Sequence, residues 1–232
     1  MTATHHDPAL DARYWPVPVL RAVPLLVLGL VTTFVNDHSA SIGLTVFGST
    51  TIAGGILLAV ASWRYLADAS SRTLAVVQGV VGVVFGLVAL LAPSGGLPTL
   101  VAVVTGWAVI TGALELFTGL RRRRESQLAR DWMLLGGLTL ALALVYLVVP
   151  TDYSKQLGGI EEIRGTLTSS TILVGVVGAY GALVGVFLII QGLSLKWQTG
   201  QPETYRAPGS GAAEPRVSGE THDSSTDGAH SS

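Results

Sequence analysis

A single glutamate inside an apolar run is the residue of this chain that first suggests chemistry. The stretch "GALELFTGLRRRR" places Glu115 in an otherwise uncharged segment, which four arginines then end. An ionisable side chain within a membrane is rare and is by default a candidate functional group. Three interpretations stay open for Glu115: a hydrogen bond between helices, a proton-linked or ligand-binding role, and a position at the membrane interface.

Gln78 and Gln191 are the other long polar side chains within apolar runs, and we expect them to be the partners of Glu115. A polar cluster shared by three membrane helices is more often an interhelical contact than a transport site. We therefore expect Glu115 to be protonated and to donate to a neighbouring helix. On this interpretation, replacing Glu115 with glutamine is almost neutral.

The composition places the chain among membrane proteins. Of its 232 residues 49% are hydrophobic and 12% are charged, and soluble domains carry about 25% charged residues. The absence of cysteine excludes disulfides, thiolate catalysis and cysteine-ligated metal sites. A net charge of −1 gives no indication of nucleic acid as a partner.

Six apolar runs are long enough to span a bilayer, which takes roughly 20 helical residues. Their approximate limits are Val19–Val35, Ile42–Ser62, Leu74–Ala92, Leu97–Leu120, Met133–Val149 and Thr171–Leu195. Tight turns and longer basic loops alternate between them. The sequence thus predicts an all-α integral membrane protein with six transmembrane helices, arranged as three related helical hairpins. We expect a short cytoplasmic segment over 1–16, the membrane domain over 17–197 and a disordered cytoplasmic tail over 198–232.

Small residues recur within the runs and indicate where helices pack. Such residues let helix backbones approach closely in a membrane, and the candidates for this role are Gly48, Gly54, Ala108, Gly112, Gly119, Gly185 and Gly192. A shift of 58 residues carries Gly54 onto Gly112 and Gly79 onto Gly137, and a shift of 73 carries Gly112 onto Gly185. We interpret these matches as an internal repeat.

The basic residues predict the orientation in the membrane, because cytoplasmic loops are enriched in Lys and Arg. Of the 14 basic residues, 12 fall on one predicted side: Arg13, Arg21, Arg64, Arg72, Arg121, Arg122, Arg123, Arg124, Arg130, Lys196, Arg206 and Arg216. Both termini are therefore expected in the cytoplasm. The cluster formed by Arg121 to Arg124 and Arg130 is expected to fix topology and to contact anionic lipid headgroups.

Two other segments contain residue types that could carry chemistry. The turn Asn36-Asp37-His38-Ser39 contains an Asp–His pair that could bind a metal or sense pH. Two adjacent side chains are too few for a closed metal site, so we favour turn formation and helix capping. The outer loop Thr151–Thr168 is long enough for a short surface helix but not for a domain.

The repeated pattern of a glycine-rich span ending in basic residues carries a family resemblance. The segments "GWAVITGALELFTGLRRRR" and "RDWMLLGGLTLALALVYLVVP" resemble the HdeD-like membrane proteins, also called the DUF308 short-repeat family. The resemblance covers roughly Ala40 to Lys196. It implies a six-helix bacterial inner-membrane protein, associated in the best-known member with acid resistance and with no established enzymatic activity.

These observations favour a non-enzymatic membrane protein without cofactor or metal, which supports envelope or acid-stress physiology or serves as a membrane-complex subunit. Its expected partners are the lipid bilayer, anionic headgroups, and copies of itself or other membrane subunits, and not nucleic acid. The alternative is a small transporter or channel in which Glu115 has a proton- or ligand-linked role. An enzyme would need convergent acid, base or metal ligands, and the sequence offers no such set.

The charge asymmetry predicts the result of a topology measurement. Reporter fusions after Ala92 and Thr151 should report the outer face, because few basic residues flank these turns. Fusions after Arg72 and Arg130 should report the cytoplasm. A reversed result at two of these four sites would contradict the predicted topology.

Overall fold

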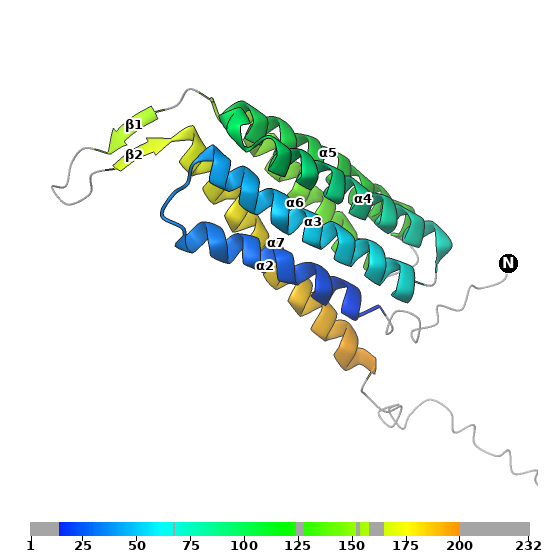
Figure 1. The fold of residues 1–232 in the computed structure, drawn as a ribbon. Coiled ribbons are helices and arrows are strands. Elements are labelled where there is room, and N and C mark those ends of the chain that lie inside the picture. Colours follow the sequence, from blue (N-terminus) through cyan, green and yellow to red (C-terminus); the bar gives the residue numbers. More distant parts are fainter. Residues whose placement is uncertain (1–13, 67, 124–127, 152–153, 158–164, 200–232) are drawn as a thin grey trace, which may run out of the picture. The chain divides into compact units, whose positions relative to one another are not determined.

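The computed structural model describes residues 14–66, 68–123, 128–151, 154–157 and 165–199. Six long helices make up almost all of this part of the chain (Figure 1). They are α2 (Pro16–Phe34), α3 (Ala40–Tyr65), α4 (Ala69–Leu91), α5 (Gly96–Arg122), α6 (Leu128–Val148) and α7 (Ser169–Thr199). Each contains a window long and apolar enough to cross a membrane. The predicted fold class, six membrane helices packed as hairpin pairs, is confirmed.

Local sequence signals set where the helices begin. Pro16 occupies the first position of α2, where its missing N–H costs nothing. The side chains of Ser39 and Asp68 cap α3 and α4 by accepting hydrogen bonds from the backbone N–H groups of Ile42 and Ser71. Gly96 follows the short 3₁₀ helix η1 (Pro93–Gly95) with φ of 64°, a conformation that favours glycine.

The helices extend beyond the apolar runs on the basic side of the bundle. The predicted loop Trp63–Thr73 shrinks to the few residues between α3 and α4, since α3 continues to Tyr65 and α4 begins at Ala69. Likewise, α5 continues through Arg121 and Arg122. Arginine and tryptophan are compatible with helix and favour the membrane interface. The limits of an apolar run therefore indicate the part of the helix that crosses the membrane, and the helix itself can continue beyond them.

Three pairs of helices pack most extensively: α3 with α4, α5 with α6, and α2 with α7. The first two pairs are joined by the basic loops and not by the tight turns. Loop length predicted that α2 would pack most closely on α3 and α4 on α5, whereas the closest hairpins are α3 with α4 and α5 with α6. The third pair joins the first and last helices, which lie side by side in Figure 1. The neighbours α2 and α3 also pack together, whereas α6 and α7 make few contacts.

Glycines bring the backbones of each pair together. A Cβ placed on Gly55 of α3 would lie 2.5 Å from the carbonyl oxygen of Gly79 in α4. On Gly136 of α6 it would lie 2.7 Å from the carbonyl oxygen of Gly112 in α5. These two contacts are related by a shift of 57 residues, one fewer than the shift that sequence identities suggested. One residue turns a helix by about 100°, so only the shift of 57 matches the packing.

Most of the small residues that were expected at helix contacts do lie where the two helices of a pair meet. At three of them an added Cβ would lie within 3.0 Å of a backbone carbonyl oxygen across the contact: Gly48 at Gly86, Gly119 at Ala129 and Gly192 at Trp15. Gly185 packs on Leu26, and Ala108 is fully buried. Gly54 instead faces Pro24 of α2, and the adjacent Gly55 takes the close contact with α4.

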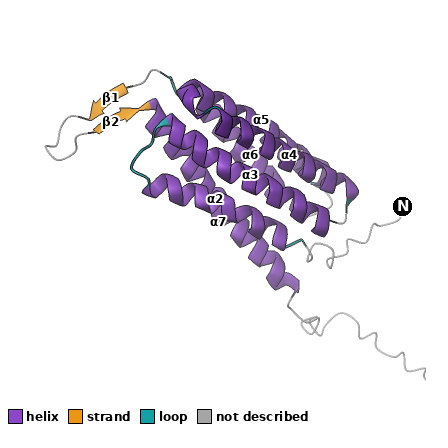
Figure 2. Ribbon diagram, in the orientation of Figure 1, coloured by secondary structure: helices purple, strands orange, loops and turns teal. Residues whose placement is uncertain are grey.

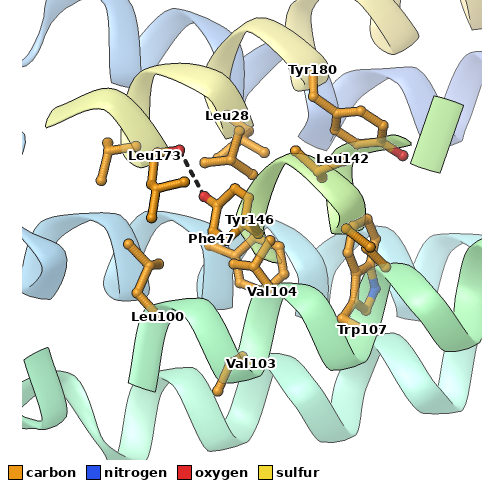
Figure 3. Close-up of a cluster of buried hydrophobic side chains, with 14 of the residues drawn as sticks. Leu28, Phe47, Leu100, Val103, Val104, Trp107, Leu142, Tyr146, Leu173 and Tyr180 are labelled. Atoms are coloured by element: carbon orange, nitrogen blue, oxygen red, sulfur yellow. Dashed lines mark hydrogen bonds between the residues drawn. The ribbon is translucent and has the colours of Figure 1, made fainter. Parts of the chain in front are cut away.

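A dense apolar core fills the bundle on the side away from the basic loops. The rings of Phe47 and Trp107 meet edge to face with centroids 5.3 Å apart, and Trp107 meets Tyr180 in the same way at 6.2 Å. The Tyr146 hydroxyl donates to the backbone carbonyl of Leu173 over 2.7 Å, which joins α6 to α7 (Figure 3). Leu100 and Val104 are fully buried beside these rings.

The loop between α6 and α7, in which a short surface helix was expected, is described only at its two ends. Its described ends form an antiparallel pair, β1 (Ser154–Leu157) and β2 (Gly165–Thr168), with Ser154 opposite Thr168 (Figure 2). Thr166 and Thr168 are β-branched and favour strands, and the glycines of this loop disfavour helix. Residues 1–13, 67, 124–127, 152–153, 158–164 and 200–232, among them the predicted disordered tail, lie outside the described residues.

The close glycine contacts predict a strong positional effect on stability. Gly55→Leu should destabilise the bundle by about 1–3 kcal/mol or more, the usual range for overpacking, because its Cβ meets the backbone of α4. Gly137→Leu is the matched control, since nothing lies within 4 Å of a Cβ at that position. Thermal unfolding in detergent or bilayers measures both. Equal losses for the two variants would contradict the packing described.

Candidate functional site

Glu115 lies in a buried polar cluster formed by three helices. Gln78 of α4 donates from Nε2 to Oε1 of Glu115 over 2.6 Å. The guanidinium of Arg21 in α2 forms an ion pair with the same oxygen. Glu115 is only 4% exposed, and it lies six residues, about 9 Å along the helix axis, from Arg121. The cluster Arg21–Gln78–Glu115 therefore joins α2, α4 and α5 inside the membrane-spanning part of the bundle.

Arg21 is the member that could not be recognised from the sequence alone. It was expected among the positive-inside charges of the N-terminal region, but its side chain is only 15% exposed and faces Glu115. Arginine stays protonated in proteins, and a charge within a membrane needs a partner. Glu115 was expected to be protonated and to donate a hydrogen bond. In the structure it instead accepts hydrogen bonds and forms an ion pair with Arg21. The sequence did contain one indication of this pair: Arg21 lies inside the first apolar run, and its charge is opposite to that of Glu115.

Gln191 does not join this cluster. Its Nε2 donates to Oδ2 of Asp131 over 3.0 Å, which connects α7 to the first turn of α6. From the sequence, Asp131 was expected in a loop, because the apolar run begins only at Met133. The Gln191–Asp131 contact is thus separate from the Arg21–Gln78–Glu115 cluster and joins a different pair of helices.

Two small cavities adjoin the Arg21–Gln78–Glu115 cluster. The inner cavity, about 30 Å³, is lined by the cluster together with Tyr14, Ser71, Thr118 and Trp132. The central cavity, about 50 Å³, lies beyond Arg21 and Gln78 and reaches Thr50, Thr111 and the ring of Trp107. Sites for drug-sized ligands are about 300–1,000 Å³, so these cavities have room for only a few water-sized molecules.

The basic cluster at the end of α5 contacts the loop between α3 and α4. Arg122 pairs with Asp68 at 2.7 Å, and Arg121 donates to the Ser70 hydroxyl at 2.7 Å. Partial burial acts to raise the pKa of Asp68, but hydrogen bonds from Ser71 and the charges of Arg122 and Arg121 bring that pKa below its ordinary value. Among the other arginines of this predicted cluster, Arg123 and Arg130 are exposed, and Arg124 lies outside the described residues.

The Asp–His turn acts in helix capping. Asp37 accepts hydrogen bonds from the backbone N–H and the hydroxyl of Ser39, and Ser39 in turn caps α3. His38 Nε2 lies 2.9 Å from the carbonyl oxygen of Thr32 at the end of α2. These contacts close the turn between α2 and α3, in agreement with the interpretation favoured from the sequence.

The fold and the buried cluster define a multi-pass membrane protein. Residues 77–149, which contain most of α4, all of α5 and all of α6, match the family described as "Short repeat of unknown function (DUF308)". The expected DUF308 repeat is thus confirmed for this segment. The name HdeD-like is associated with that family in general. Comparisons with curated proteins and with solved structures found no match. The matched segment includes Gln78 and Glu115 but not Arg21.

The ion pair predicts an order of stabilities that differs from the expectation of a neutral glutamine replacement. Glu115→Gln leaves the Arg21 charge buried without its partner, which costs about 3–5 kcal/mol for a typical buried pair. Arg21→Gln should cost less, because the remaining carboxyl can take up a proton. The double variant Arg21→Gln/Glu115→Gln should recover part of the loss. Unfolding free energies in bilayers measure all three.

Asp131→Asn is the matched control for this series, because the described partner of Asp131 is the neutral Gln191. It should change stability far less than Glu115→Gln does. A Glu115→Gln variant as stable as the original chain would show that Arg21 does not depend on this carboxylate.

Proposed function

We propose that this chain is a non-enzymatic HdeD-like protein of the bacterial cytoplasmic membrane that supports the envelope during acid stress. The observation that carries the proposal is the Arg21–Gln78–Glu115 cluster, in which Arg21 and Gln78, from two different helices, both bind Glu115 on a third. Such a cluster fixes the arrangement of a helical bundle. The small volume of the adjoining cavities supports a structural role over binding of a metabolite-sized substrate.

The surface of the bundle supports the proposed partners. Apolar side chains are exposed along every long helix, with Leu30, Val60, Leu91, Leu144 and Leu183 among the most exposed, and lipid is the medium in which such surfaces are stable. Arg123 and Arg130 are exposed beside the predicted cytoplasmic end and suit anionic headgroups. We further propose that the chain associates with copies of itself or with other membrane subunits through its lipid-facing helices.

A second candidate function is a small channel or transporter. The observation in its favour is that cavities lie on both sides of the ion pair. Against it stands the packed core of Phe47, Trp107 and Tyr180, which leaves no described polar path through the other half of the bundle.

Acid survival tests the proposed function. A strain that lacks the gene should survive a shift to acid less well than its parent, and the full-length chain supplied in trans should restore survival. Gly137→Leu should restore it too, because this substitution leaves the bundle intact, whereas Glu115→Gln should not.

Two results would contradict the proposal. One is equal survival of the parent and the deletion strain. The other is steady proton or ion flux through the purified chain in proteoliposomes, lost in Glu115→Gln protein that remains folded, which would favour the channel or transporter instead.

A further inference from the structure

One oxygen of Glu115 has no described partner. Oε1 is bound by Arg21 and Gln78, but Oε2 is buried and makes no hydrogen bond with any described residue. The Glu115 side chain is 3% exposed. A buried carboxylate oxygen without a partner costs free energy, and groups of this kind are usually satisfied by protein or by ordered water.

The inner cavity supplies the room and the hydrogen-bonding groups that water needs. It is about 30 Å³, and a water molecule takes about 10–15 Å³ by this measure, so about two molecules fit. Besides the cluster, the hydroxyl-bearing residues Tyr14, Ser71 and Thr118 line it. Hydroxyls donate and accept, so water in this cavity can bind both them and Glu115.

A second cavity continues from the inner one toward the surface. Ser71 and Thr118 also line a polar cavity of about 190 Å³, together with Asp68, Ser70 and the two arginines Arg121 and Arg122. The Asp68 and Arg122 side chains are 38% and 29% exposed, so this cavity lies at the surface. Ser71 and Thr118 thus line both this cavity and the cavity beside Glu115.

Apolar side chains pack on the other side of the cluster. Phe47, Trp107 and Leu28 line the central cavity beyond Arg21 and Gln78, and they belong to the apolar core, part of which is drawn in Figure 3. Among the described residues, the polar path to Glu115 therefore comes from the end where α5 meets the loop between α3 and α4.

We propose that the inner cavity is a water site and that Glu115 exchanges a proton with the aqueous phase on this one side of the membrane. In the uptake step, a hydronium ion in the cavity transfers a proton to Oε2 and leaves water behind. Arg21 keeps its charge, so the net charge of the cluster rises by one. In the release step, the proton returns to water by the same route, and the ion pair with Arg21 is restored. The inference holds for either candidate function.

The charged and titratable groups around Glu115 come from several elements. Arg21 of α2, Tyr180 of α7 and Tyr14 before α2 interact electrostatically with it. Asp131 of α6 lies near Tyr14, and Gln78 of α4 is neutral. Arg21 is the positive charge among them, and its guanidinium forms the ion pair with Glu115.

Infrared spectroscopy of the full chain in lipid bilayers tests the proposal. Acid should produce a protonated-carboxyl band that is missing in Glu115→Gln protein, and this band should shift in D₂O as the proton exchanges. Thr118→Leu fills the path and should slow that exchange about tenfold, which corresponds to about 1.4 kcal/mol of added barrier. Thr111→Val is the control, because Thr111 makes the same backbone hydrogen bond within α5 but lines only the central cavity.

A second set of variants tests the sidedness without filling the core. The chain has no cysteine, so a bulky thiol label can be attached at Ser70→Cys, beside the surface cavity, or at Ser94→Cys in η1 at the other end of the bundle. The label at 70 should slow exchange, and the label at 94 should not. The proposal is overturned by exchange that neither Thr118→Leu nor the label at 70 slows, by equal effects of both labels, or by a Glu115 carboxyl that acid does not protonate in the folded protein.

Discussion

The charge of Arg21 is the constraint on which the arrangement of this bundle depends. A guanidinium cannot lose its proton in a protein, and in the membrane interior it is tolerated only beside an opposite charge or in water. Glu115 of α5 supplies that charge, and Gln78 of α4 binds the same oxygen. The pair thereby holds the first helix against the middle of the chain, while α2 packs along its length on the last helix, α7.

Glycine contacts supply the second constraint, because the polar cluster forms only if the helices approach closely. Backbone-to-backbone contact at Gly55 and Gly79 joins α3 to α4, and contact at Gly112 and Gly136 joins α5 to α6. Gln78 lies next to one of these glycines and Glu115 one turn from another, so both side chains start from closely packed parts of their helices. The same geometry recurs in α2 and α7, where a Cβ on Gly181 would lie 2.7 Å from the carbonyl oxygen of Leu25. Glycine contacts therefore hold the helices together within each pair, and the buried ion pair connects α2 of one pair to α5 of another.

Much of this fold could be predicted from the sequence, and the reasons for the exceptions are physical. Each of the six apolar runs forms a helix, and a glutamate and a glutamine isolated in such runs were expected to meet, as Gln78 and Glu115 do. Arg21 was missed because a basic residue near the start of a run fits both a membrane interface and a buried pair, and only the three-dimensional contact distinguishes them. Gln191 was paired wrongly because Asp131 precedes its apolar run while already belonging to α6. The repeat was misplaced by one residue because Gly54 matches Gly112 at a shift of 58, whereas the glycine of α3 that makes the equivalent close contact is Gly55, at a shift of 57.

The distance between the Arg21 guanidinium and the Glu115 carboxyl in a lipid bilayer is the most direct test of the central ion pair. Solid-state NMR can measure it as the dipolar coupling between ¹⁵N in arginine side chains and ¹³C in glutamate carboxyls, with Arg21→Lys protein to assign the signal. We predict a strong coupling, as expected for a charge-assisted hydrogen bond of about 2.7–2.9 Å between nitrogen and oxygen, which disappears in the Arg21→Lys spectrum. A spectrum unchanged by Arg21→Lys would contradict the claim that this ion pair joins α2 to the rest of the bundle.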